Sequence, residues 1–188
     1  PKPKEIGIIF SIDNTSVSDD LKLILKTNKA SLPILRKDSL ALIFYRNNTI
    51  NEVVTLTLKN IEETQQELFF DKSKMQHGVN VVTLFKNYQP VSERKFFVNK
   101  QEKQTAILID ELETENDSTS FKIRTINSTL DPISAQLSLS IQPKNSKSFH
   151  ENQTIKSAFL LTPYIKGKVE NPAYYFKNGS AKEAQHLD

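Results

Sequence analysis

The chain has 188 residues, 37% of them hydrophobic, which suffices for one large domain or for two of about 90–100 residues. The absence of Cys excludes a disulfide scaffold, a cysteine nucleophile and thiolate metal sites. A net charge of +3 without any block of like charges gives no footprint of nucleic-acid binding. The apolar runs are far shorter than the roughly 18 residues of a membrane span, so we expect no membrane-spanning segment.

The first half of the chain repeats apolar side chains at every second position, which is the period of β-strands. In residues 21–27, for example, Leu21, Leu23 and Leu25 lie on one face and Lys22 and Lys26 on the other. A corner at 87–90 joins the last two strands as a hairpin, because Asn tolerates left-handed geometry and Pro lacks a ladder N–H. The pattern predicts about seven short strands, which is typical of a β-sandwich: 5–13, 21–27, 40–46, 53–60, 66–70, 78–86 and 92–98.

Residues 99–103 interrupt this rhythm and are expected to form a linker. Strands are predicted again at 105–112, 119–126 and 134–142, and the last has the cleanest alternation in the chain. Residues 153–161 fit either a strand or a short helix, and 180–187 carry helix formers behind a Ser180 cap. The predicted fold class is therefore all-β, with two tandem immunoglobulin-like antiparallel β-sandwiches at 1–99 and 100–188 and a short irregular or helical C-terminal tail.

Two stretches resemble a known family. VNVVTLFKNYQPVSERKFFV (79–98) resembles the end of macroglobulin-like domains of the α2-macroglobulin superfamily, through Leu84, Phe85, Pro90, Arg94, Phe96 and Val98. AFLLTPYIKGKVENPAYYF (158–176) is similar to a segment of large cell-envelope proteins of Bacteroidetes-type bacteria, through Leu160, Leu161, Gly167, Glu170, Asn171, Pro172, Tyr174, Tyr175 and Phe176. Thr162-Pro163 departs from the pattern of that segment. Without Cys, the thioester of classical macroglobulins is impossible here.

In the resembled envelope proteins, macroglobulin-like modules precede a carboxypeptidase-regulatory-like domain and a TonB-dependent receptor plug. The resemblance therefore implies macroglobulin-like sandwiches in a non-enzymatic, extracytoplasmic, outer-membrane-associated protein that serves nutrient uptake or envelope assembly. The chain would act there as a spacer or protein-interaction module, with protein partners or neighbouring domains of the same chain. Two alternatives stay open: a carbohydrate-binding or adhesive module, and a protease-trapping macroglobulin segment.

Four residues are candidates for partner or glycan binding. Arg94 could contact a partner, although an arginine whose stem packs on its own sheet is the favoured interpretation. Tyr88, Tyr174 and Tyr175 could form an aromatic platform. For Tyr174 and Tyr175 packing is favoured, in a segment that Pro172 should hold extended.

No motif nominates a catalytic, cofactor-binding or metal-binding residue. The sequence has no GxSxG and no Gly-rich phosphate loop, and the three histidines form no spaced pair. The acidic stretch 110–120 could supply oxygen ligands to Ca²⁺, but a solvated hairpin with charged edges is the favoured interpretation.

Overall fold

The computed structural model describes residues 5–14, 18–58, 63–100, 105–143, 146, 152–176 and 186–187. The chain divides into two compact units, one made of residues 1–100 together with 150–188 and the other of residues 101–149. The two units are described separately below.

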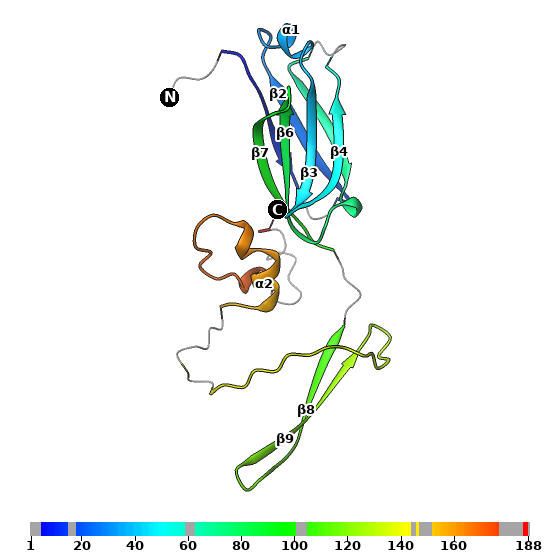
Figure 1. The fold of residues 1–188 in the computed structure, drawn as a ribbon, viewed down its shortest axis with the longest axis vertical. Helices are drawn as coiled ribbons and strands as arrows, with labels where there is room; N and C mark the ends of the chain where they lie inside the picture. The colour runs from blue at the N-terminus through cyan, green and yellow to red at the C-terminus, as the bar shows by residue number, and fades with distance from the viewer. Residues whose placement is uncertain are drawn as a thin grey trace. The chain divides into compact units, whose positions relative to one another are not determined.

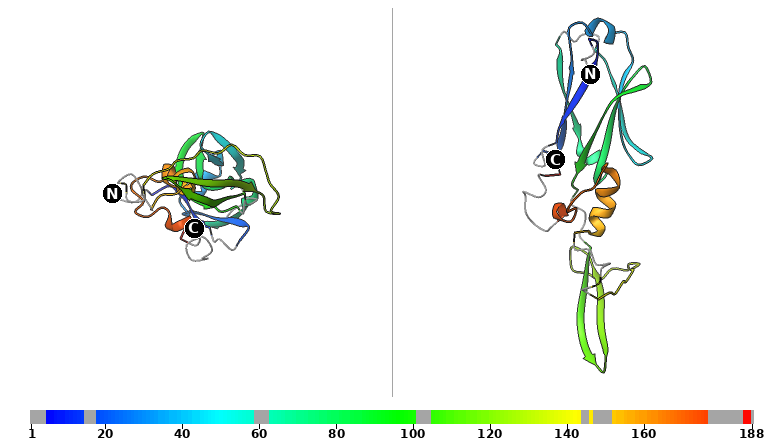
Figure 2. Two further views of the ribbon diagram at one scale, coloured as in Figure 1. Left: turned by 90° about the horizontal axis from the view of Figure 1, so that it is seen from below. Right: turned by 90° about the vertical axis from the view of Figure 1, so that its left-hand side faces the viewer.

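The first unit contains a β-sandwich of two antiparallel sheets, which form two layers in Figures 1 and 2. One sheet has the order β1-β2-β5, with β1 (Ile8–Asp13), β2 (Asp20–Thr27) and β5 (Gln65–Asp71). The other has the order β4-β3-β6-β7, with β3 (Leu40–Arg46), β4 (Thr49–Leu56), β6 (Gly78–Lys86) and β7 (Gln89–Val98). The prediction of seven strands in this part of the chain is confirmed.

The core lies between the two sheets and takes alternate residues from each strand. Leu21, Leu23 and Leu25 of β2 are buried, as the alternation predicts. Across from them the other sheet contributes Leu42 and Phe44, and the Phe44 ring lies 4.6 Å from that of Phe70 in β5. Because every second side chain of the four-stranded sheet enters this core, the intervening ones point to the outside of the sandwich.

Short helical elements complete the first unit: α1 (Leu32–Leu35), η1 (Lys72–Lys74), α2 (Ile155–Leu160), η2 (Thr162–Tyr164) and η3 (Tyr174–Phe176). Thr154 and Ser157 form a capping box at the start of α2, which decides the strand-or-helix alternative in favour of a helix. The extended conformation predicted after Pro172 is wrong: the N–H of Phe176 bonds the carbonyl of Ala173 in a 3₁₀ turn. Except for 186–187, the helix expected over 180–187 lies outside the described residues.

The described part of the second unit contains one hairpin, β8 (Ala106–Glu115) and β9 (Ser118–Ile126). Asn116 and Asp117 both have positive φ, 44° and 66°, at its two-residue turn. The favoured interpretation of the acidic stretch as a hairpin is thus confirmed.

The strand predicted over 134–142 is wrong for this structure. Pairing with β9 ends at the bridge between Ile126 and Pro132, and none of the described strands lies beside residues 134–142. Alternation shows which side chains would share a face, but a strand forms only where a neighbour accepts its backbone hydrogen bonds. Tandem sandwiches are therefore not confirmed; the chain is mostly β, with a short helical region near its C-terminus. No helix in the described part of the chain combines the length and the apolar composition that crossing a membrane requires.

Candidate functional site

The outer face of the four-stranded sheet is unusually apolar. Ile43 of β3 and Phe85 of β6 lie on this face, half-buried. Ile50 and Val53 of β4 lie beside them and are 61% and 56% exposed. An antiparallel sheet with one solvated face normally alternates apolar-in and polar-out, so this face has the composition of a contact surface.

One end of the outer face is covered by the chain's own residues 152–176. Val79 of β6 and Phe97 of β7 are buried there against Leu161, which follows α2. The ring of Phe176 lies 6.1 Å from that of Phe97. Figure 1 shows α2 beside the ends of β6 and β7, strands that are more than 50 residues earlier in the chain. The sandwich thus already binds one helical segment through this face.

Arg46, the last residue of β3, joins the covering segment to the sandwich. Its guanidinium donates to the carbonyl oxygens of His77 and Phe159, the latter at 3.0 Å, and to the hydroxyl of Tyr164 at 3.3 Å. It also lies 4.9 Å from the centre of the Tyr164 ring. Gly78 makes room for this arrangement, because an added Cβ would stand 2.9 Å from Nη2 of Arg46.

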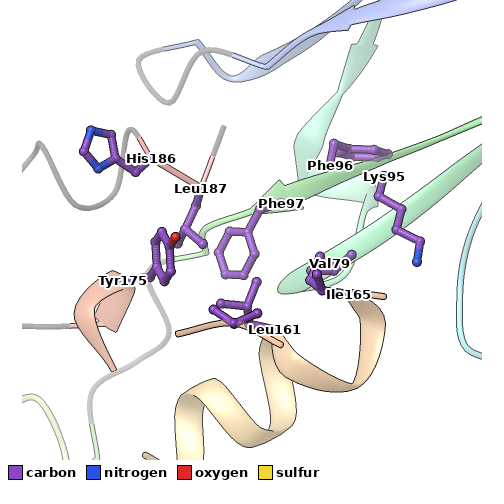
Figure 3. A pocket seen from close by; sticks show the side chains of 10 residues that line it. Val79, Lys95, Phe96, Phe97, Leu161, Ile165, Tyr175, His186 and Leu187 are labelled. Atoms are coloured by element: carbon purple, nitrogen blue, oxygen red, sulfur yellow. The ribbon is translucent and has the colours of Figure 1, made fainter. Parts of the chain in front are cut away.

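A cavity of about 290 Å³ lies where the segment meets the sheet (Figure 3). Its lining is mainly apolar: Val79, Lys95, Phe96, Phe97, Leu161, Ile165, Val169, Tyr175, His186 and Leu187. The side chains of Phe97, Leu161, Tyr175 and Leu187 point toward one another in Figure 3, whereas the Lys95 amine points away and donates to the carbonyl of Tyr164. Apolar and aromatic side chains thus predominate in the lining, as they do in a packing contact.

The uncovered part of the outer face forms an open groove of about 390 Å³. It is lined by Ile43, Tyr45, Asn47, Asn48, Ile50, Thr83, Phe85, Pro90 and Glu93. One carboxylate oxygen of Glu93 accepts from the hydroxyl of Tyr45 at 3.1 Å and from that of Thr83 at 3.2 Å. These bonds hold an aromatic ring and an acid in fixed positions beside two asparagines, an arrangement suited to binding a partner with both apolar and polar groups.

Tyr88 lies at the tip of the β6–β7 hairpin, close in sequence to Pro90, which lines this groove. Tyr88 is 87% exposed and has φ of 65°, a left-handed conformation that non-glycine residues seldom adopt. Asn87 exchanges two hydrogen bonds with Ser39 and donates to the Asp38 carboxylate at 2.7 Å. The tip is therefore anchored to the chain just before β3.

The Asp38 carboxylate at this anchor is stabilised in its charged form. The hydrogen bond from Asn87 lowers the pKa of Asp38 below its ordinary value, and Lys86, at 3.2 Å, lowers it further.

The structure places the four predicted site residues in different surroundings. Arg94 is exposed on β7; its guanidinium lies 5.7 Å from the ring of Phe10 in β1 of the other sheet and donates to the carbonyl of Glu93. Tyr174 and Tyr175 are half-buried with their rings 5.3 Å apart, and the Tyr174 hydroxyl lies 3.1 Å from Nδ1 of His186. Of the four, Tyr88 and Arg94 are exposed, as contact residues would be.

Arg46 and the Tyr45–Glu93 pair were missed by the sequence analysis. Arg46 carried one signal, a cation directly after the apolar run of residues 40–45. Its partners His77, Phe159 and Tyr164 are 31 to 118 residues away in sequence, so no local pattern reveals them.

The comparisons with known proteins add no relative. No protein-family model matches the chain, and no curated protein or solved structure matches it either.

Proposed function

We propose that this chain is a non-enzymatic interaction module that binds a protein partner or a neighbouring domain through the outer face of its four-stranded sheet. The observation that carries the proposal is that one end of this face already binds residues 152–176, while the other end is equally apolar and open. A face that buries Val79 and Phe97 under one segment has the chemistry to bury Ile50 and Val53 under another.

The expected gain from such binding is modest for each residue and useful in sum. Fully burying an isoleucine or valine side chain contributes about 1.5–3 kcal/mol, before the cost of association is subtracted. Ile50 and Val53 retain more than half of their surface to bury. Tyr88, held on an anchored turn, adds a rigid aromatic group of the kind that dominates many interfaces.

As for cellular role, we propose a spacer or interaction region of a larger extracytoplasmic protein associated with an outer membrane. The support for this part is the resemblance of 79–98 and 158–176 to macroglobulin-like envelope proteins. A rigid sandwich core with contact residues on a sheet face and a hairpin tip suits such a role.

Site-specific photo-crosslinking tests the proposal. A photoreactive residue is placed at Val53 on the open face, and the matched control carries it at Ile9 of β1, which is 58% exposed on the other sheet. We expect position 53, in the parent protein in its own cells, to crosslink to one defined polypeptide segment, identified by mass spectrometry. Equal yields at the two positions, or no crosslink at position 53, would contradict the proposal.

A second candidate function, glycan binding, is favoured by the groove itself. Tyr45 and Phe85 offer aromatic rings, while Glu93 and the asparagines at 47 and 48 offer polar groups. Binding on a glycan array that disappears in Tyr45→Ala, but persists in Tyr174→Ala, would support this candidate over a protein partner.

A further inference from the structure

We propose that residues 134–140, which have no strand neighbour among the described residues, can pair with the open edge of β9 as a third strand and so turn the β8–β9 hairpin into a three-stranded sheet with one apolar face. This inference goes beyond the proposed function and does not depend on it.

The first hydrogen bonds of this pairing are already present. The N–H of Ile133 bonds the carbonyl of Thr125 at 2.9 Å, and the N–H of Asn127 bonds the carbonyl of Asp131 at 3.0 Å. Together they make an antiparallel bridge between Ile126 and Pro132. The chain therefore leaves β9, turns, and starts back along the same strand in a defined register.

The turn that reverses the chain is fixed by its own hydrogen bonds. Oδ1 of Asn127 accepts from the N–H groups of Thr129 and Asp131, both at 2.9 Å. The hydroxyl of Thr125 donates to the carbonyl of Ile133 on the far side of the turn. These contacts hold the returning chain beside β9 at the point where further pairing would begin.

Continued in this register, the pairing places apolar side chains opposite apolar ones. Directly opposite residues of antiparallel strands point to the same face. The apolar face would then pair Ile123 with Ala135, Phe121 with Leu137, and Thr119 with Leu139. The opposite face would pair Arg124 with Ser134, Lys122 with Gln136, and Ser120 with Ser138.

The existing hairpin presents the matching surface. Ile109 lies opposite Ile123 and Ile107 opposite Thr125, so β8 adds its isoleucines to the same face as Phe121 and Ile123. These side chains are exposed, as are Leu137 and Leu139 at 50% and 68%. A shift of one residue would move the leucines to the charged side, where Asp110 and Arg124 form an ion pair at 2.8 Å.

Two further features of the sequence and fold favour pairing. An isolated two-stranded hairpin is marginally stable in water, and a third strand with a shared apolar face is the usual remedy. The described residues place no other strand on this edge of β9. Pro132 and Pro143, which lack a ladder N–H, flank the segment, and no proline interrupts it.

Engineered disulfides test the register in a chain that has no cysteine of its own. Lys122→Cys/Gln136→Cys places the thiols at a non-hydrogen-bonded pair, whose Cα atoms lie about 4.5 Å apart in an antiparallel sheet, within disulfide range. The control Lys122→Cys/Ala135→Cys places them on opposite faces. We expect the first pair to oxidise within one molecule at least about tenfold faster than the control in a glutathione buffer.

Hydrogen exchange of the unmodified chain provides a second readout that needs no variant. In the proposed register the amides of Ala135, Leu137 and Leu139 point to β9, and those of Gln136 and Ser138 point away. We expect the first set to exchange at least about tenfold more slowly than the second, after correction for intrinsic rates. Uniform exchange across 134–140, equal oxidation of the two cysteine pairs, or a disulfide that joins two molecules would each overturn the proposal.

Discussion

Replacing Arg46 by Lys tests whether one guanidinium holds residues 152–176 on the sandwich. The guanidinium makes three hydrogen bonds, to His77, Phe159 and Tyr164, and stacks on the Tyr164 ring. A lysine ammonium keeps the charge but lacks the planar fork, so we expect it to retain only the bond to His77, within the sandwich, and to lose the two bonds to Phe159 and Tyr164 that reach the covering segment.

The magnitude follows from the bonds that are lost. A hydrogen bond to a charged group contributes about 1.5–3 kcal/mol net, and this site is partly exposed, so the lower value applies to each of the two lost bonds. The total is about 3 kcal/mol, which corresponds to about a hundredfold increase in the population with the segment detached.

Hydrogen exchange at α2 measures that population. The amides of Ala158 and Leu161, bonded within the α2 turn region, should exchange about a hundredfold faster in Arg46→Lys, while core amides such as that of Leu84 stay near their original rates. Arg124→Lys is the control, because its ion pair with Asp110 is exposed and contributes at most about 1 kcal/mol. If α2 in Arg46→Lys exchanges within about threefold of the original rate, the guanidinium does not hold the segment.

Three further predictions concern unfolding in urea. Gly78→Ala should lower the free energy of unfolding by about 2 kcal/mol, because the φ of 101° at Gly78 and the nearby guanidinium of Arg46 both oppose a Cβ. The control Gly7→Ala, with open space around the added atom, should change the free energy of unfolding by less than about 0.5 kcal/mol. Equal effects of the two substitutions would contradict the steric argument. Tyr88→Gly should raise the free energy of unfolding by about 0.5–1 kcal/mol, since glycine takes the positive φ without strain, and a loss of stability would show that the tyrosine packs. Asp38→Asn should flatten the dependence of stability on pH. A carboxyl whose pKa is lowered by folding adds stability at pH values above its ordinary pKa, and this stability is lost as the pH falls through the pKa of the folded chain, so the original chain should lose more stability than the variant between about pH 5 and 3. Parallel curves for the two chains would contradict the role given to Asn87.

The strands of the sandwich were predictable because one physical signal decides them. Leu21, Leu23 and Leu25 share one face of β2, and the apolar patterns of 40–46 and 78–86 locate β3 and β6 to the residue, whereas β7 begins at Gln89, three residues before the predicted start at 92. The boundaries of β4 were predicted less accurately. Residues 53–60 were predicted, and Thr49–Leu56 is observed, because the turn at Asn47 sets the register of β4 against β3.

What covers the outer face could not be predicted. Alternation places Val79 and Phe97 on one side of the sheet, but it carries no information about which distant residues lie on them. The candidate site shares this limit. Tyr88 is recognisable as a turn residue beside Pro90, whereas the pairing of Tyr45 with Glu93 depends on strand order.

The division of the chain has a consequence for its synthesis. Residues 101–149 interrupt the first unit, so a ribosome completes all seven sandwich strands before it makes the segment that shields Phe97. At about 5–20 residues per second, the roughly 50 intervening residues take several seconds. During that time the apolar end of the nascent sandwich is exposed to solvent, until the later residues of the chain cover it. A chaperone would therefore find its largest apolar binding surface in this interval.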